Sequence, residues 1–257
     1  MDQLSARQNE ILSLAREQGR VVVDELSRTF SVSPQTIRKD LNELCDRRIL
    51  QRIHGGAIVG SGIENVSYEA RRLLAPESKR LIGRKAAELI PDNSSLLVNI
   101  GTTTEQVAHA LKSHHGLLVI SNNVNAVHIM KDFIGIELII AGGLVRLSDG
   151  RIVGEAAIDF INQFKVDYAV IGVSAIDEDG SLLDYDFREV RVAQAIIKNA
   201  RHVILVADQL KLERSAPVRL GYVSQLDTIV TDGVFPLGLR EICTEHGVDI
   251  VVARDTI

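Results

Sequence analysis

The sequence predicts an α/β protein with two domains, a small one made of helices and a short hairpin and a larger one of mixed strands and helices. Two observations carry this prediction. Between residues 95 and 252, short β-branched runs alternate with helical stretches, which is typical of a parallel sheet covered by helices. Before this alternation begins, glycines at positions 55, 56, 60 and 62 interrupt the chain, and such a composition favours a linker. We therefore predict domains over residues 1–57 and 79–257, joined by a linker over residues 58–78.

Composition and charge narrow the classes of function. The 257 residues are 46% hydrophobic and 25% charged, as in globular rather than disordered proteins. The net charge of −5 disfavours a general positive coat for nucleic acid, yet residues 1–60 carry a net +1 and the remainder −6. The cysteines at 45 and 243 lack the spacing of a disulfide framework or metal site, and no apolar run approaches the roughly 18 residues of a membrane span. We expect a cytoplasmic protein with no cofactor, metal ion or membrane partner.

The small domain begins with two predicted helices. Apolar spacing predicts a first helix over about residues 4–17. The β-branched run Val21–Val23 follows it, and a second helix then places Leu26 and Phe30 on one face. This order of elements brings the chain to a tight turn before a third helix.

The third helix carries the strongest signal of function in this domain. Ser33 suits the N-cap and Pro34 the first helical position. Ile37, Leu41 and Leu44 recur at helical spacing and are predicted to pack inward. The opposite face carries side chains that hydrogen-bond base edges and phosphates, namely Gln35, Arg38, Lys39 and Asn42.

A β-hairpin is predicted to follow the third helix. Residues 49–58 alternate about the pair Gly55–Gly56, as in a wing. Helix, short helix, turn, polar-faced helix and wing form a winged helix-turn-helix plan. A three-helix bundle with merely solvated charges is the alternative, but it does not account for the joint occurrence of these features. We predict that Gln35, Thr36 and Arg38 read bases, that Asn42 shares their face, and that Ser33, Lys39, Arg52 and His54 hold the DNA backbone.

The segment Phe30–Leu41, followed by Arg52–Ala57, resembles the winged helix-turn-helix of the DeoR family of bacterial sugar-catabolism repressors. Two positions depart from the family pattern, which usually has Arg at position 39 and a larger aliphatic residue at position 15. Lys39 keeps the charge but lacks the bidentate fork of arginine. The resemblance implies a repressor whose partner is double-stranded operator DNA.

The larger domain contains seven predicted strands. They lie at residues 95–100, 117–121, 136–141, 168–173, 202–206, 227–230 and 248–252. In open sheets of this kind, ligands bind at the carboxyl ends of the strands. The first strand is followed by Gly101, Thr102, Thr103 and Thr104 and then by a helix, a composition suited to a phosphate. The alternative, that the threonines only cap the helix, stays open at this point.

Polar residues also follow the other predicted strands. Amides, carboxylates, a glycine pair and a lysine at one sheet edge are suited to a polyol and its phosphate. Each residue alone also has a purely structural interpretation as a turn, bend or cap. The candidates are Asn122, Gly142, Gly143, Asp186, Glu189, Asp208 and Lys211.

This half of the chain resembles the sensor domain of the same family, which shares a fold with ribose-phosphate isomerase and CoA-transferases. The resemblance implies that the Gly101–Thr104 loop binds phosphate and that Asn122, Gly142–Gly143, Glu189 and Lys211 belong to the sugar site. Within the family, three segments most resemble members that respond to glycerol 3-phosphate. They are Ile100–Thr103 with Val107–Leu111, Gly154–Ala156 with Asp159–Ile161, and Asp179–Leu183. Fructose 1-phosphate and deoxyribose 5-phosphate are the alternative effectors.

An enzymatic function is the remaining alternative. An aldose–ketose isomerase needs a carboxylate base and a group that polarises the carbonyl, and Glu189, Asp186 and Lys211 offer both kinds of group. A fused DNA-reading domain, however, needs a sensor rather than a catalyst. We expect a repressor without catalytic residues, assembled as a homo-oligomer (dimer or tetramer), because several linked pockets supply the large preference that release requires.

Overall fold

Two compact units make up the chain, Met1–Pro76 and Glu77–Ile257. The computed structural model describes residues 4–18, 20–47, 49–53, 55–59, 68–212 and 214–254. Helix α4, Tyr68–Leu73, lies inside the interval expected to be a linker and is grouped with the first unit. Among the described residues, no helix combines the length and the apolar character that crossing a membrane requires.

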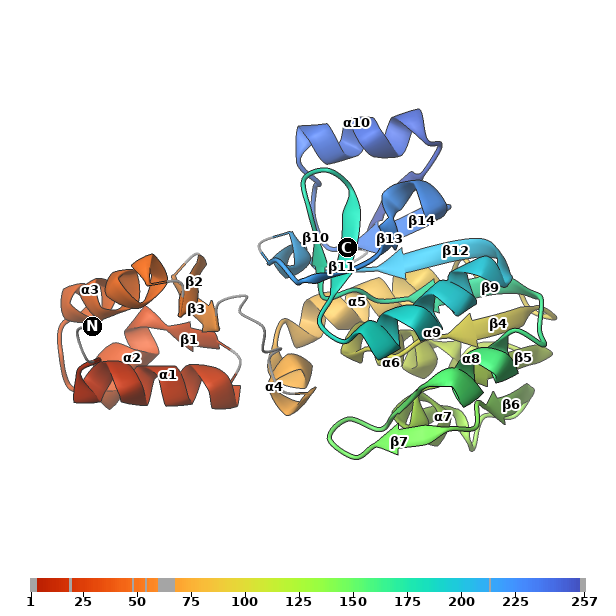
Figure 1. Ribbon diagram of the computed structural model, residues 1–257, viewed down its shortest axis with the longest axis horizontal. Helices are drawn as coiled ribbons and strands as arrows, with labels where there is room; N and C mark the ends of the chain where they lie inside the picture. Colours follow the sequence, from red (N-terminus) through yellow and green to blue (C-terminus); the bar gives the residue numbers. More distant parts are fainter. Residues whose placement is uncertain are drawn as a thin grey trace. The chain divides into compact units, whose positions relative to one another are not determined.

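The first unit is a winged helix-turn-helix, as the sequence predicts (Figure 1). Its antiparallel sheet has the order β1-β3-β2, so the β-branched run before the second helix adds a third strand to the predicted hairpin. The elements are α1 (Ala6–Gln18), β1 (Arg20–Val22), α2 (Val23–Thr29), α3 (Pro34–Asp46), β2 (Leu50–Ile53) and β3 (Gly56–Val59).

The core of the first unit lies beneath α3. Ile37, Leu41 and Leu44 are fully buried, which confirms the predicted inward face. Asp40 is buried beside them and forms a bidentate ion pair with Arg7 of α1, with Nε–Oδ2 and Nη2–Oδ1 distances of 2.6 and 3.2 Å. This ion pair, which the helical pattern alone did not reveal, fixes α3 against α1.

The second unit is built on a seven-stranded parallel sheet, and each strand coincides with a predicted β-run. The order across the sheet is β15-β14-β12-β9-β4-β5-β6. Each neighbouring pair is parallel. The strands are β4 (Ser95–Val98), β5 (Leu117–Ser121), β6 (Ile136–Ile140), β9 (Val166–Ile171), β12 (Ala200–Val206), β14 (Thr228–Thr231) and β15 (Asp249–Val252).

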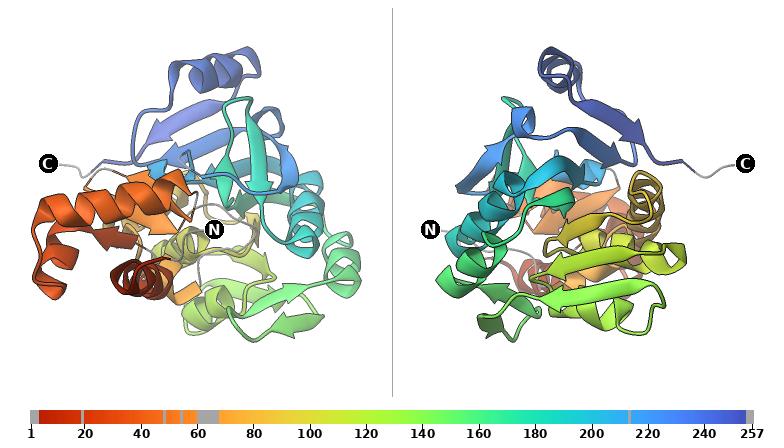
Figure 2. Two further views of the ribbon diagram at one scale, coloured as in Figure 1. Left: turned by 60° about the vertical axis from the view of Figure 1, so that its left-hand side comes forward. Right: turned by 90° about the vertical axis from the view of Figure 1, so that its right-hand side faces the viewer.

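Helices cover both faces of this sheet (Figures 1 and 2). Successive residues of β4 point to opposite faces, with Leu96 in one hydrophobic core and Leu97 in the other. Helices α5, α6 and α7 pack on the Leu96 side, while α8, α9 and α10 pack on the Leu97 side. The helices are α5 (Pro76–Ala87), α6 (Thr102–Ala110), α7 (Val124–Met130), α8 (Glu155–Ile161), α9 (Phe187–Lys198) and α10 (Leu237–Glu245).

Several short elements were not predicted from the sequence. Strands β10, β11 and β13 form a small antiparallel sheet, and β7 and β8 form a separate hairpin. Their lengths of two to five residues leave little periodicity to detect. They are β7 (Leu144–Arg146), β8 (Arg151–Val153), β10 (Ala175–Ile176), β11 (Ser181–Asp184) and β13 (Val218–Tyr222), with 3-10 turns at η1 (Leu111–Ser113), η2 (Gln209–Lys211) and η3 (Val223–Gln225).

The strand order changes direction at one position in the sheet, between β4 and β9. From β4 the chain proceeds outward through β5 to β6, whereas β9, β12, β14 and β15 lie in turn on the other side of β4. The order therefore reverses between β4 and β9. Ligands of open α/β sheets bind in the crevice at such a switch point, outside the carboxyl ends of the strands.

Candidate functional site

The exposed face of α3 is the candidate DNA-reading surface. The Ser33 hydroxyl caps the helix by accepting from the Thr36 amide at 3.2 Å, and Pro34 occupies the first turn. The side chains predicted to share the outer face are exposed, namely Gln35, Arg38, Lys39 and Asn42, whereas Thr36 is half-buried. The hydroxyl of Thr36 lies 2.9 Å from the hydroxyl of Ser33, so it also supports the cap.

The wing contributes one described cation to the same unit. Arg52 is exposed on β2. His54, the other wing residue expected to hold the DNA backbone, lies outside the described residues. Of the positively charged residues predicted to contact DNA, the described part of this unit contains Arg38, Lys39 and Arg52.

The candidate phosphate site is the first turn of α6, which directly follows β4 at the switch point. Gly101 is the N-cap with φ of 146°, a backbone conformation that favours glycine. The Thr104 hydroxyl donates to the Gly101 carbonyl at 2.8 Å. A nine-residue helix presents its unpaired N–H groups and the positive end of its dipole here.

The threonines of this turn are not helix caps. No side chain caps α6, and only Thr104 forms a local hydrogen bond. Thr102 and Thr103 are 9% and 5% exposed, and their hydroxyls form no hydrogen bond within the described parts of the chain. Two buried donors beside the first backbone amides of a helix are the kind of groups that can bind an anion.

Asparagines after β5 join α6 to its neighbours. Asn123 caps α7 by accepting from the Asn125 amide at 2.9 Å, and both amide side chains donate to Glu105 of α6 at 3.2 Å. Asn122 is 1% exposed and donates to the Ile152 carbonyl at 3.2 Å. Its Oδ1 atom is buried without a hydrogen-bond partner in the described structure, so this acceptor is unsatisfied there.

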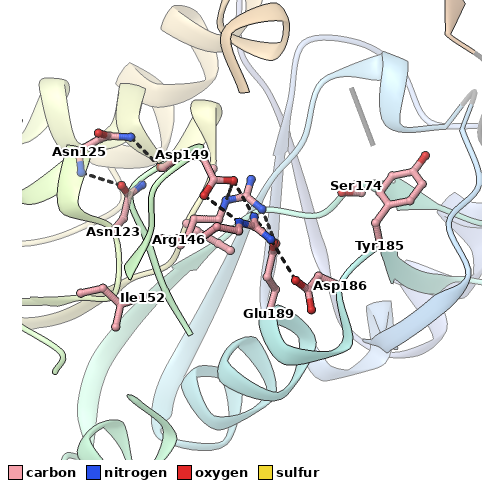
Figure 3. A network of polar contacts seen from close by, with 12 residues as sticks. Asn123, Asn125, Arg146, Asp149, Ile152, Ser174, Tyr185, Asp186 and Glu189 are labelled. Atoms are coloured by element: carbon pink, nitrogen blue, oxygen red, sulfur yellow. Dashed lines mark hydrogen bonds and ion pairs between the residues drawn. The ribbon is translucent and has the colours of Figure 1, made fainter. Parts of the chain in front are cut away.

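An ion-pair network lies beyond these asparagines and was missed from the sequence (Figure 3). Arg146 of β7 contacts Asp149 and Asp186, with N–O distances of 2.6 and 3.0 Å, and also contacts Glu189. Arg151 of β8 pairs with Asp149 at 3.1 Å and with Glu189. The dipeptide Asp149–Gly150 between alternating apolar residues is the hairpin signal that points to these arginines.

The network changes how the two predicted carboxylates are interpreted. Glu189 is 4% exposed and lies between two guanidinium groups. Asp186 caps α9 by accepting from the Arg188 amide at 2.9 Å, and its hydrogen bonds to Arg188, with the charge of Arg146, lower its pKa. Both carboxylates are thus paired with arginines of the protein itself. Of the two arginines that contact Glu189, Arg146 is 27% exposed and Arg151 is 5% exposed, so Arg146 is the more accessible.

The remaining predicted residues follow other strands of the same sheet. A Cβ atom at Gly142 would meet nothing within 4 Å, whereas Gly143, with φ of 148°, packs closely on Ile152. Asp208 is 2% exposed, and its Oδ1 atom is buried without a partner in the described structure. Lys211 is half-buried in η2.

Comparisons with known proteins show what the two units are similar to. The family model for the DeoR-like helix-turn-helix domain matches residues 7–61, and that for the DeoR C terminal sensor domain matches residues 74–233. The chain is 45% identical to the glycerol-3-phosphate regulon repressor of Escherichia coli (strain K12), over 95% of this chain and 97% of that protein. It is 42% identical to the protein of the same name from Haemophilus influenzae, over 98% of each. A solved D-ribose-5-phosphate isomerase in complex with phospho-erythronic acid matches with a TM-score of 0.40 and 17% identity, over 53% of this chain and 54% of that one.

Proposed function

Because the chain belongs to the DeoR family of transcriptional repressors, we propose that it represses a carbon-catabolism regulon and is released from its operator by glycerol 3-phosphate. The first turn of α6 is the observation that carries the effector half of this proposal. Its free amides and the hydroxyls of Thr102 and Thr103 are donors placed at the switch point of the sheet. Donors of this kind at a helix N-terminus favour binding of a phosphate dianion.

The glycerol part of the effector is matched by one buried acceptor on the strand next to β4. Asn122, at the end of β5, carries an Oδ1 atom without a partner within the described residues. An unsatisfied buried acceptor costs about 1–3 kcal/mol, and a glycerol hydroxyl that donates to it removes this cost. Asp208 follows β12, three strand positions away from β5, which is about 14 Å at the usual strand spacing, so its Oδ1 atom is beyond the reach of the same glycerol. The ion pairs of Arg146 with Glu189 and Asp186 would shape the glycerol end of the site. Lys211 would add positive charge to the site.

Operator recognition is assigned to α3 and the wing. In this plan α3 enters the major groove, with Gln35, Thr36 and Arg38 toward the bases. Ser33, Lys39, Arg52 and His54 are assigned to the DNA backbone and Asn42 to the same face. Because residues 1–60 carry a net charge of only +1, affinity depends on a few placed contacts rather than a general field.

The test is operator release measured by fluorescence anisotropy. The probe is a labelled duplex selected from a random-sequence pool by the full-length protein. Glycerol 3-phosphate is compared with fructose 1-phosphate, deoxyribose 5-phosphate, glycerol and inorganic phosphate. Release by glycerol 3-phosphate at the lowest concentration supports the proposal, and release by another phosphosugar at lower concentration assigns a different effector. Failure to select any duplex contradicts the DNA half.

A further inference from the structure

An apolar strip lies at the edge of the second unit. Four large apolar side chains gather at the end of β6 and along β7 and its turn. They are Ile140, Leu144, Val145 and Leu147, with exposed fractions of 42%, 67%, 40% and 95%. Strand β6 is an edge strand of the seven-stranded sheet, and β7 pairs only with β8 among the described strands. An exposed apolar edge of this kind is a template for association with another chain.

The buried side of the hairpin is β8, while Arg146 of β7 adds ion pairs to Asp186 and Glu189 at the start of α9. Ile152 and Val153 of β8 are 3% and 2% exposed, and the Ile152 amide donates to the Asn122 carbonyl at 2.9 Å. Arg146, the one charged residue of β7, is engaged by Asp149, Asp186 and Glu189. The segment that carries the strip, residues 138–148, therefore offers a partner apolar side chains and backbone groups. Its one charged residue, Arg146, is already paired with carboxylates of the same chain.

We propose that β7 pairs in antiparallel fashion with β7 of a second copy of this chain, across a two-fold axis. A strand paired with itself in this way is self-complementary, and the neutralised Arg146 means that the two copies oppose no like charges. The strip presents no free cation to attract DNA or an anionic membrane. This inference rests on the proposed function, because paired operator half-sites require two copies of α3.

The first unit does not provide an equivalent surface. Every large hydrophobic side chain that is exposed in the described structure lies at residue 134 or beyond. The apolar residues of the winged helix-turn-helix pack in its own core, where Ile37, Leu41 and Leu44 are fully buried. Association through apolar contacts is therefore placed on the second unit.

Sedimentation velocity of the full-length protein tests the surface with a matched pair of variants. Leu147→Lys places a charge on the strip, while Leu237→Lys makes the same change at a 63% exposed position on α10. We expect the wild type and Leu237→Lys to sediment as dimers or larger even assemblies. We expect Leu147→Lys to need at least tenfold more protein to associate, with an unchanged melting temperature. A monomeric wild type, or equal behaviour of the two variants, overturns the proposal.

A cysteine crosslink tests the strand pairing itself. Opposed residues of an antiparallel pair have Cα atoms about 4.5–5.5 Å apart, which lies within the span of a disulfide. Val145→Cys, at the centre of β7, should therefore link two copies on mild oxidation, whereas Leu237→Cys should not. A wild-type dimer in which Val145→Cys fails to crosslink refutes the pairing. Binding of glycerol 3-phosphate to Leu147→Lys, measured by calorimetry, separates failure of the interface from failure of the effector assignment.

Discussion

Arg151 is the residue whose replacement tests the buried network most directly. Its side chain is 5% exposed, and that of its partner Glu189 is 4% exposed. Removing one member of a buried ion pair typically costs about 3–5 kcal/mol, because the other charge stays buried and uncompensated. Arg146 still contacts Glu189, so we expect Arg151→Met to lower the free energy of unfolding by about 3 kcal/mol, the lower end of that range.

Arg188→Met is the matched control in the same network. Arg188 pairs with Asp186 at 2.7 Å, but its side chain is 47% exposed. Exposed ion pairs are screened by solvent and contribute little to stability, so we expect a loss well below that of Arg151→Met. The two variants remove the same type of side chain and differ mainly in burial.

Urea denaturation followed by tyrosine fluorescence measures both variants. The chain has no tryptophan and four tyrosines, and Tyr168, Tyr185 and Tyr222 lie in the second unit. Protein concentration is held constant because association shifts apparent stability. Adding Glu189→Gln should reduce the cost of Arg151→Met by at least about 1 kcal/mol, as expected for residues in direct contact. Equal costs for Arg151→Met and Arg188→Met would refute the argument from burial.

Three further predictions concern DNA, effector and pH. Arg38→Ala should weaken specific operator binding by about 1–3 kcal/mol in anisotropy titrations while effector binding survives; equal loss of both indicates misfolding. Thr103→Val should raise the glycerol 3-phosphate concentration needed for release by about 10–100-fold, the equivalent of a lost charged hydrogen bond of about 1.5–3 kcal/mol, with Thr103→Ser as the control; unchanged release places the phosphate elsewhere. Burial, with the nearby charge of Glu189, raises the pKa of Asp184, so the folded state disfavours its ionised form and loses stability as pH rises above the ordinary Asp pKa. The melting temperature of Asp184→Asn, minus that of the wild type, should therefore increase between about pH 4 and pH 7. A difference that stays constant over this range contradicts the prediction.

Local patterns predicted much of this protein. The inward face of α3 and its exposed opposite face follow from helical spacing around Ile37 and Leu41, and the structure shows both. The seven strands of the sheet coincide with seven apolar runs because buried parallel strands are hydrophobic on both faces. The loop Gly101–Thr104 was identified by its composition and its position after a strand.

Partners distant in the chain were not predictable in the same way. Arg146 lies 40 and 43 residues from Asp186 and Glu189, and nothing in the local sequence around either carboxylate predicts its contact with Arg146. The same holds for Arg7 and Asp40, which are 33 residues apart. Asp186 and Glu189 are predicted as ligand contacts from their position alone, and the structure adds that both are paired with arginines.

The sequence by itself determined the strands of the seven-stranded sheet, the exposed polar face of α3 and the loop suited to phosphate, because these depend on spacing within one turn or one strand end. Only the tertiary structure decided which polar groups are already satisfied. Among the described residues, the Thr102 and Thr103 hydroxyls and the buried Asn122 Oδ1 atom have no partner, whereas Glu189 is paired with two arginines. The physical reason is that a hydrogen bond or ion pair needs two groups within about 3 Å, and long-range packing alone brings them there.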